Sequence, residues 1–515
     1  MAGGVLAKVH SAAVWGVDAY PVEVEINARP GHPAVVVVGL PDTAVKESRD
    51  RVMTAVTSSA FRFPYGRVTF NLAPADVKKE GPSFDLPMAL GIVAASDQLP
   101  LRDLDQYWVV GELALTGDVR AIKGALAIAL SARKHKIKGL LLPAANAAEA
   151  AVVEGLNVYP VKHLREAAEF LAGNALIRPV TADPNTILGE FDAIEHDFSD
   201  VKGQEHVKRA IEVAVAGGHN VLMIGPPGSG KSMLAKRIPG ICPPLTLDEA
   251  LETTKVHSIA GLLPQDTGMV TRRPFRSPHH TISDAGLIGG TANPSPGEVS
   301  IAHNGVLFLD ELPEFRRSAL EVLRQPLEDG TVTISRASGS MTFPSQFMLV
   351  AAMNPSPGSG GFGDAERGRA SQAAIRKYLN KISGPLLDRI DIHVEVPAVK
   401  HETLLRPHAA ESSATIRTRV LAARKIQLER FAAKRKVRSN AQMTSKDLKV
   451  HVPLDEESEG LLRMALTELS LSARAYDRIL KVSRTIADLA GAEKVAAEHL
   501  SEAIQYRTLD RQVWG

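Results

Sequence analysis

An apolar run that leads directly into a glycine-rich turn constrains this chain more than any other feature. Residues 220–232 read Asn-Val-Leu-Met-Ile-Gly-Pro-Pro-Gly-Ser-Gly-Lys-Ser, and a helix-compatible stretch, Met-Leu-Ala-Lys, follows. Glycines let successive backbone N–H groups curl around an anion, and the next helix presents its positive end to the same point. The spacing Gly-x4-Gly-Lys-Ser between a strand and a helix therefore predicts a phosphate-binding loop.

The residue types in this loop predict a site for ATP with Mg²⁺. We expect Lys231 to reach the β- and γ-phosphates, and the Ser232 hydroxyl to bind the Mg²⁺ ion. The remaining loop residues would bind phosphate mainly through the backbone: Gly225, Pro226, Pro227, Gly228, Ser229 and Gly230.

Two further strand-like runs end in polar residues that suit the same chemistry. Gly305-Val-Leu-Phe-Leu ends in Asp310 and Glu311, and Phe347-Met-Leu-Val-Ala-Ala-Met ends in Asn354. We expect Asp310 to complete the Mg²⁺ shell and Glu311 to polarise the attacking water. Asn354 could hydrogen-bond that water or the γ-phosphate. The alternatives are two surface acids that end a strand and a turn-forming Asn before Pro.

Composition and patterning predict a multidomain α/β protein. The chain has 515 residues, of which 44% are hydrophobic and 23% charged, with a net charge of +2. Strand and helix signals alternate over 1–176, fade over 177–199 into a linker rich in Pro, Asp and Asn, and alternate again over 200–400. Residues 401–515 are strongly helical in pattern.

The single cysteine, Cys242, excludes a disulfide framework and a cysteine-based zinc site. It also favours a reducing compartment.

The first residues lack a signal-peptide pattern, and apolar runs fall short of a membrane span. We therefore expect a cytoplasmic protein without a membrane partner.

Four long segments carry a resemblance to a known family. They span residues 273–283, 296–312, 383–393 and 472–476. Together with the phosphate loop they resemble the magnesium-chelatase-related AAA+ ATPases, and more specifically the ComM (YifB-type) family, over nearly the whole chain. The resemblance implies a Lon-protease-like N-terminal α+β domain, a P-loop AAA+ core with a parallel sheet, and a C-terminal helical lid.

The same resemblance implies roles for two arginines. Arg389 matches the arginine finger that reaches the γ-phosphate of a neighbouring subunit, and Arg474 matches the second sensor arginine of the lid. A guanidinium that arrives only on assembly would stabilise charge on the transferred phosphoryl group. The alternatives are an ion pair of Arg389 with Asp388 or Asp391, and a plain surface position for Arg474.

Two insertions follow from the resemblance as well. Residues 275–299 match an insert in the second AAA+ helix, and 331–343 match a hairpin before the first sensor. The pattern Thr-Val-Thr-Ile, Arg-Ala-Ser-Gly, Met-Thr-Phe independently predicts strand, turn and strand. Such hairpins point into the pore of related ring motors, so Arg336 would contact DNA phosphates. The alternative is a solvated charge.

The chain departs from its relatives at two places. Many ComM-like proteins carry two Cys pairs around the loop after the first sensor, but here the matching positions are Ser356, Gly358, Gly368 and Ala370. A metal-stapled loop is therefore excluded.

We interpret His279, His280 and His303 as polar or pore residues, because adjacent histidines offer no chelating face.

A protease activity is not expected. Lys79-Glu-Gly-Pro-Ser83 matches the segment around the nucleophilic serine of Lon, but Ile128 occupies the position of the lysine base. An apolar side chain cannot accept the serine proton.

One segment is locally basic in an otherwise neutral chain. Residues 416–438 hold nine Lys and Arg side chains, Arg424 and Lys425 among them, and one acid, Glu429. This asymmetry predicts a track for a phosphate backbone. The alternative is a solvated helix face that contacts acids of a neighbouring subunit.

The resemblance implies a homo-oligomer, expected to be a hexamer, that hydrolyses ATP and translocates on branched or single-stranded DNA. This helicase or branch-migration activity would serve homologous recombination, as in natural transformation. The alternative is a protein-remodelling or metal-insertion ATPase like the magnesium-chelatase motor subunit.

Overall fold

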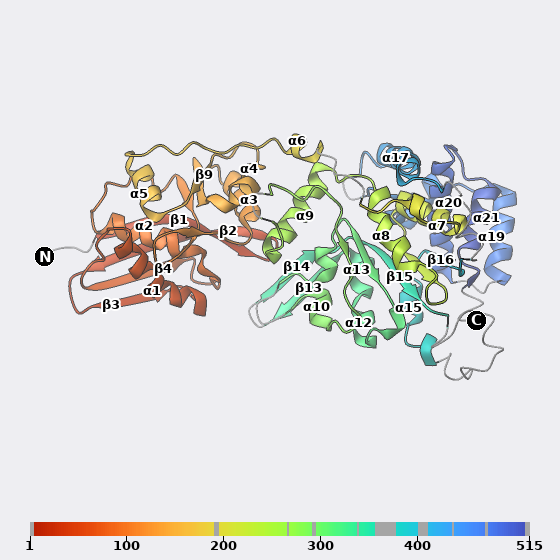
Figure 1. The fold of residues 1–515 in the computed structure, drawn as a ribbon, viewed down its shortest axis with the longest axis horizontal. Coiled ribbons are helices and arrows are strands. Elements are labelled where there is room, and N and C mark those ends of the chain that lie inside the picture. The colour runs from red at the N-terminus through yellow and green to blue at the C-terminus, as the bar shows by residue number, and fades with distance from the viewer. Residues whose placement is uncertain are drawn as a thin grey trace.

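The molecule is elongated, with a mixed sheet at one end, a parallel sheet in the middle and a group of helices at the other end (Figure 1). This computed structural model describes residues 5–189, 195–264, 267–290, 295–336, 339–355, 377–399, 410–434, 437–468 and 472–509. The predicted glycine-rich loop at 356–370 lies outside these ranges.

The N-terminal sheet has seven strands in the order β3-β4-β2-β1-β5-β8-β9. Its first two strands form a long antiparallel hairpin in which Trp15 pairs with Asp18. The strands are β1 (Val5–Trp15), β2 (Asp18–Arg29), β3 (Ala34–Val38), β4 (Arg67–Ala73), β5 (Tyr107–Val109), β8 (Gly139–Pro143) and β9 (Val158–Val161), and a small separate pair is formed by β6 (Glu112–Leu113) and β7 (Val119–Arg120).

Helices cover both faces of this sheet. Leu141 packs in one apolar cluster with α1, α2 and α5, while Leu140 and Leu142 pack in another with α3 and α4. The run Gly-Leu-Leu-Leu-Pro in β8 is fully buried because both of its faces are covered. The helices are α1 (Thr43–Ser58), α2 (Asp85–Ala95), α3 (Ala125–Lys134), α4 (Ala147–Ala151) and α5 (Leu164–Ala172).

Ile128, which stands where the resemblance would place the lysine base of Lon, is buried in the second of these clusters. Ser83 lies in a short 3-10 turn before α2. The nearby Lys79 is fully buried, and its Nζ donates to the carbonyl of Val77 across 2.7 Å.

The predicted linker is partly structured. The backbone N–H of Val180 donates to the carbonyl of Val158 across 2.8 Å, so this segment continues along the edge of the sheet. A short helix, α6 (Pro184–Gly189), follows it.

The central sheet is parallel, with the order β11-β12-β15-β10-β16. Alternate residues of β10 enter two different cores: Val221 packs with α7 and α8, and Leu222 packs with α12 and with the hairpin strands of residues 331–336 and 339–344. The strands are β10 (Val221–Ile224), β11 (Phe275–Arg276), β12 (Val306–Leu309), β15 (Met348–Met353) and β16 (Ile392–Glu395). The helices around them are α7 (Glu205–Gly217), α8 (Lys231–Ile241), α9 (Leu247–Ala260), α10 (Asp284–Ile288), α11 (Glu298–Ile301), α12 (Arg317–Val322), α13 (Arg324–Asp329) and α15 (Gly384–Leu387).

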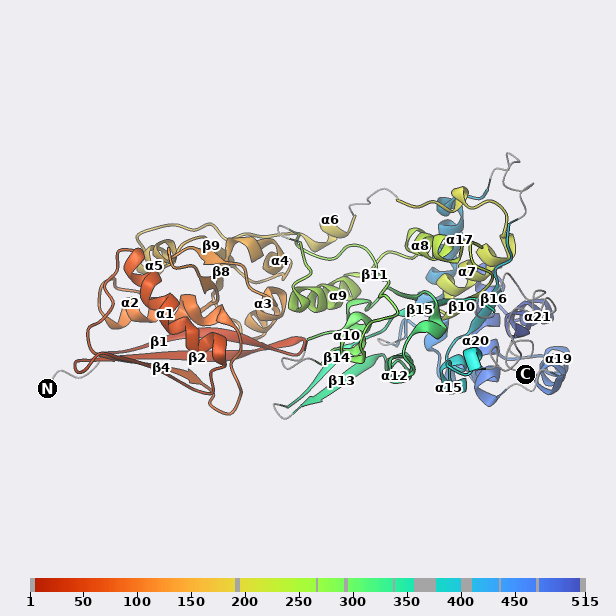
Figure 2. The same ribbon diagram turned by 60° about the horizontal axis from the view of Figure 1, so that its bottom comes forward.

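The predicted hairpin is present as β13 (Thr331–Arg336) and β14 (Gly339–Pro344), with Arg336 paired to Gly339. It meets the tip of the β1–β2 hairpin (Figure 2). A Cβ added to Gly339 would lie 2.8 Å from the ring of Trp15, so a larger residue here would force that ring to shift.

The N-terminal part also docks on α9. The buried Glu149 carboxylate accepts hydrogen bonds from the backbone of Leu126 (2.8 Å), from the Asn146 amide (3.2 Å) and from the Ser258 hydroxyl of α9. Burial raises the pKa of Glu149. The two parts of the chain therefore share a buried polar contact as well as apolar packing.

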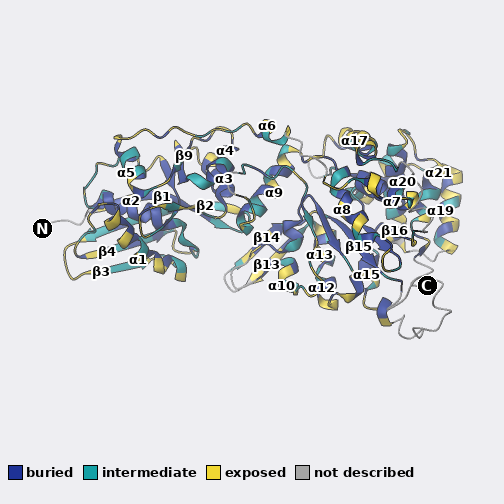
Figure 3. Cartoon of the chain, in the orientation of Figure 1, coloured by how far each residue is buried: buried dark blue, intermediate teal, exposed yellow. Residues whose placement is uncertain are grey.

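The C-terminal helices pack on α7 and α8 and share their apolar core (Figure 3). They are α17 (Ser413–Arg430), α18 (Ser445–His451), α19 (Glu456–Glu468), α20 (Ala473–Leu489) and α21 (Ala497–Gln505). Within the described ranges, the helices lack the combined length and apolarity needed to cross a membrane.

Candidate nucleotide site

The phosphate loop joins β10 to α8 in the predicted strand–loop–helix order. Gly225 lies so close to β16 that an added Cβ would be 2.1 Å from the Val396 carbonyl oxygen. Gly228 and Gly230 have φ of 76° and 92°, the left-handed region that favours glycine. The three glycines are thus fixed by backbone geometry, and they leave an open turn in front of α8.

Lys231, the first residue of α8, is held at the centre of this turn. Its Nζ donates to the carbonyl oxygens of Gly225 (2.7 Å) and Pro226 (2.9 Å) and to Oδ1 of Asn354 (3.1 Å). Burial lowers the pKa of Lys231, and the negative charges of Asp310 and Glu311 oppose that shift. The structure therefore brings Asn354 and Lys231 together.

Ser232 and the two acids lie at the same edge of the sheet. The Ser232 hydroxyl donates to Oδ2 of Asp310 across 2.5 Å, and Oδ1 of Asp310 accepts the backbone N–H of Glu311 across 3.0 Å. The Glu311 side chain is 57% exposed, and its carboxylate lies 3.6 Å from Nδ1 of His280. Asp310 is thus bonded to the loop, whereas the carboxylate of Glu311 stays accessible.

These residues surround a cavity of about 340 Å³. Its lining comprises Pro227, Gly228, Ser229, Gly230, Lys231, Ser232, Met233, Asp310, Glu311, Met353 and Asn354. These residues fit ATP with Mg²⁺. Backbone N–H groups and the Lys231 ammonium suit phosphates, and a hydroxyl beside a carboxylate suits a hard cation.

Gln204 is a contact that the sequence patterns do not reveal. Its amide donates to the carbonyl of Ser229 in the loop (2.8 Å) and to the carbonyl of Pro397 after β16 (3.0 Å). Gln204 thereby fixes the loop relative to the sheet. A glutamine before a helix carries no distinctive spacing, so only the folded chain identifies it.

Arg389 and Arg474 lie away from the cavity of their own chain. Arg389 is buried, and its guanidinium forms an ion pair with Glu328 on α13, not with the Asp388 or Asp391 considered above. Arg474 is exposed and close enough for its charge to lower the pKa of Glu328. Neither arginine lines the phosphate cavity.

The predicted phosphate track is corrected by the structure at Arg424. Its guanidinium turns inward and donates to the carbonyl of Val215 across 2.9 Å. Burial lowers the pKa of Arg424 to about 10. Lys425 is exposed on the same helix. Arg424 therefore serves the packing of α17 on α7 and not an outer DNA-binding face.

Other basic side chains of this segment pair with acids of the same chain. Arg419 bonds Glu212 and Glu411, Arg430 bonds Asp488, Lys434 bonds Asp447, and Arg438 lies near Glu249. Much of the local charge is therefore neutralised inside the molecule.

Arg336 lies at the end of β13, and its DNA contact stays a prediction.

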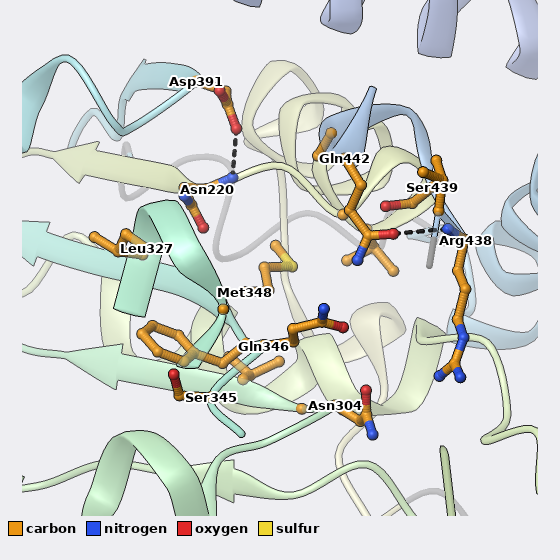
Figure 4. Close-up of a pocket in the computed structure, with 18 of the residues that line it drawn as sticks. Asn220, Asn304, Leu327, Ser345, Gln346, Met348, Asp391, Arg438, Ser439 and Gln442 are labelled. Atoms are coloured by element: carbon orange, nitrogen blue, oxygen red, sulfur yellow. Dashed lines mark hydrogen bonds between the residues drawn. The ribbon is translucent and has the colours of Figure 1, made fainter. Parts of the chain in front are cut away.

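A larger cavity, of about 570 Å³, lies at the opposite edge of the central sheet (Figure 4). Asn220 and Met348 mark the amino ends of strands there, and Gln442 and Ser439 come from the helical part of the chain. The phosphate loop and both acids are absent from its lining, so the smaller cavity is the candidate nucleotide site.

The three histidines show no metal arrangement. The rings of His279 and His280 are tilted by 33° with their centroids 4.1 Å apart, and the buried His303 lies 3.5 Å from Glu252. Among the described residues, no group of three His, Cys, Asp or Glu side chains could hold a metal ion.

A parallel sheet with a phosphate loop, two acids and a polar residue at its carboxyl edge defines a P-loop protein of the AAA+ type. Comparison with known proteins agrees. Family models described as "Magnesium chelatase, subunit ChlI", "Subunit ChlI of Mg-chelatase" and "Magnesium chelatase, subunit ChlI C-terminal" match residues 197–404, 24–146 and 410–507.

Full-length relatives make the assignment more specific. The chain is 44% identical over 508 residues to "Uncharacterized protein YifB" of Escherichia coli and 45% identical over 510 residues to "Competence protein ComM" of Haemophilus influenzae, covering 98% of each chain in both cases. It belongs to the ComM (YifB-type) family of magnesium-chelatase-related proteins. The chain is also similar over a shorter stretch to "Lon protease 2" of Bacillus subtilis, with 31% identity over 154 residues. This match covers 27% of this chain and 26% of the Bacillus protein.

Proposed function

We propose that this protein is an ATP-hydrolysing motor that assembles into a ring and acts on branched or single-stranded DNA during homologous recombination. The observation that carries the ATPase part is the cavity in which Lys231, the Ser232–Asp310 pair and Asn354 meet. These groups lie where α8 begins and β12 and β15 end, which is the edge at which parallel α/β sheets bind ligands.

Each side chain has a defined task at this cavity. Lys231 would exchange its carbonyl partners for phosphate oxygens, and Asn354 would keep the ammonium oriented during that exchange. Ser232 and Asp310 would hold Mg²⁺, which neutralises phosphate charge when bound. Glu311 would orient and polarise the attacking water from its accessible position.

A second copy of the chain would complete the site. Arg389 does not line its own phosphate cavity, so we assign it to the cavity of a neighbouring subunit. Head-to-tail contacts of this kind close into rings, and we propose a hexamer. Hydrolysis would then depend on assembly, since the stabilising guanidinium comes from the adjacent protomer.

The DNA substrate is proposed from the relatives and from the hairpin. The 45% identity with a protein named for competence extends over 98% of both chains, which supports a role in DNA processing. The β13–β14 hairpin adds a projecting element next to the core, with Arg336 at the end of its first strand. Arg336 would contact the phosphate backbone and not the bases.

One observation favours a second candidate, a protein-remodelling or metal-insertion motor like magnesium chelatase. The basic side chains Arg419, Arg430 and Lys434 are paired with acids of the same chain. They therefore offer less free positive charge for DNA than the sequence suggests.

The two candidates are separated by measuring ATPase rates with and without a four-way DNA junction, at two salt concentrations. The proposal predicts stimulation that weakens steeply as salt rises. Arg336→Ala should reduce this stimulation at least several-fold without changing the DNA-free rate, whereas the exposed Lys446→Ala serves as a matched control. A rate unaffected by any DNA would reject the DNA motor and leave the remodelling candidate.

A further inference from the structure

The backbone of Arg389 is hydrogen-bonded to the central sheet through the side chain of Asn220. Its carbonyl oxygen accepts a hydrogen bond from the Asn220 amide across 2.9 Å. Oδ1 of the same Asn220 accepts the backbone N–H of Leu349 in β15 across 2.8 Å. Rotation about the side-chain bonds of Arg389 can therefore move the guanidinium while the segment after α15 stays in place.

The guanidinium is held inside its own subunit. It donates to the carbonyl of Pro385 across 2.6 Å and forms an ion pair with Glu328, while its Nε is buried without a hydrogen-bond partner. The side chain of Arg389 is only 8% exposed, whereas that of Glu328 is 57% exposed. In this arrangement Arg389 cannot reach a phosphate on another molecule.

Glu328 interacts with both arginines that the family resemblance connects with hydrolysis. The hydrogen bond from Arg389 is the largest cause that lowers the pKa of the Glu328 carboxyl, and the charge of Arg474 adds to the shift. Other acids near Arg389 have different partners: Glu321 pairs with Arg324, and Asp391 pairs with Arg478. Glu328 is therefore the carboxylate specifically engaged by the arginine.

Glu328 is also close in sequence and space to the hairpin. The helix α13 ends at Asp329, and β13 begins at Thr331. A cavity of about 450 Å³ beside the pair is lined by Glu328, Arg389, Val332 and Thr333, among others. A shift of the hairpin would thus displace the carboxylate that holds Arg389.

We propose that Glu328 is a positioning residue that retains Arg389 in its own subunit until the β13–β14 hairpin shifts. Release would let the guanidinium exchange a carboxylate partner for the γ-phosphate bound by the neighbouring protomer. The inference rests on the proposed function, because it needs Arg389 to act on a neighbour's nucleotide. It adds the residue that links the hairpin to that action.

The physical basis is competition between two anions for one guanidinium. A carboxylate and a phosphate each accept the same paired N–H donors, so Arg389 cannot serve both. Removing the charge of Glu328 weakens the retained state and leaves the fold intact, because glutamine has the same shape and the position is exposed. A partly exposed pair contributes up to about 1 kcal/mol, which corresponds to about a fivefold change in rate.

The test is a double-mutant cycle of Glu328→Gln and Arg389→Ala, assayed as kcat and KM for ATP in the assembled protein. Glu328→Gln should raise the DNA-free kcat about two- to fivefold, leave KM unchanged within about twofold, and reduce the relative stimulation by a four-way junction. In the Arg389→Ala background the same substitution should leave the residual rate unchanged. Glu321→Gln, in the neighbouring helix α12, is the matched control and should behave as wild type.

Each outcome decides one question. If Arg389→Ala is inactive but Glu328→Gln leaves kcat unchanged or lowers it, the retention proposal is wrong and the shared active site stands. If Glu328→Gln raises kcat equally in both backgrounds, it does not act through Arg389, and the proposal also fails. If Arg389→Ala keeps the wild-type rate, the role of Arg389 in the proposed function is itself wrong.

Discussion

The Ser232 hydroxyl donates to Oδ2 of Asp310 across 2.5 Å, and this contact joins the first turn of α8 to the end of β12. The two residues are 78 positions apart in the sequence. Their meeting brings the ligands expected for Mg²⁺ next to the lysine expected for phosphate. The geometry therefore turns two separate sequence motifs into one site.

Lys231 and Glu311 should fail in different ways when substituted. Lys231→Ala removes the ammonium that we assign to phosphate binding, so nucleotide binding and hydrolysis should both be lost. Glu311→Gln keeps the cavity and its donors, so it should bind ATP within a few-fold of wild type while kcat falls by about 10²–10⁴. A fluorescent-nucleotide titration and a phosphate-release assay measure the two properties, and equal loss of binding in both variants would contradict the assigned roles.

Arg424 and Lys425 offer a contrast between an inward and an outward basic side chain. Arg424→Ala leaves the carbonyl of Val215 without its donor, at a cost of about 1–3 kcal/mol of stability. We expect a lower melting temperature and little change in DNA affinity. Lys425→Ala should leave the melting temperature unchanged and give a smaller salt dependence of DNA binding if DNA follows α17. The reverse pattern would show that the side-chain positions are misassigned.

Asp447 should make the stability of the helical part depend on acid pH. Burial alone would raise the pKa of Asp447, but the Lys434 ammonium and the donors of Thr444 lower it to about 2. A carboxyl with a depressed folded-state pKa stabilises above its unfolded pKa of about 4 and loses that contribution as pH falls toward 2.

Asp447→Asn should therefore lower the free energy of unfolding by about 1–2 kcal/mol at pH 7. The difference from wild type should persist down to about pH 4 and shrink between about pH 4 and pH 2. Urea unfolding followed by circular dichroism measures it, with the exposed Asp105→Asn as control. A difference that does not change over this pH range would exclude the carboxylate as its source.

Local patterns predicted the nucleotide loop because its chemistry depends on residues that are contiguous. Gly225 through Ser232 act through one turn of backbone, and Asp310 and Asn354 each end a buried strand. Parallel strands bring their carboxyl ends together, so the order of the chain already implies their proximity. The hairpin at 331–344 was predictable for the same reason, since both strands and the turn are adjacent.

Contacts between distant segments were not predictable. The nine basic residues of 416–438 suggest a charged face, but Glu212 of α7 pairs with Arg419 and Asp488 of α20 pairs with Arg430. Glu328, the partner of Arg389, is 61 positions away and shares no motif with it.

The helix α2 has 11 residues, nearly all of them buried, so it shows no amphipathic period to detect.

The central claim is that ATP is cleaved between two copies of this chain, one providing the phosphate loop with Glu311 and the other providing Arg389. Mixing the Arg389→Ala and Glu311→Gln proteins, each expected to be inactive alone, tests it directly. Random assembly at a one-to-one ratio should restore about a quarter of the wild-type ATPase rate, because about one interface in four then combines an intact Glu311 with an intact Arg389. Mixtures that stay inactive at every ratio, although the two proteins co-assemble, would contradict the account.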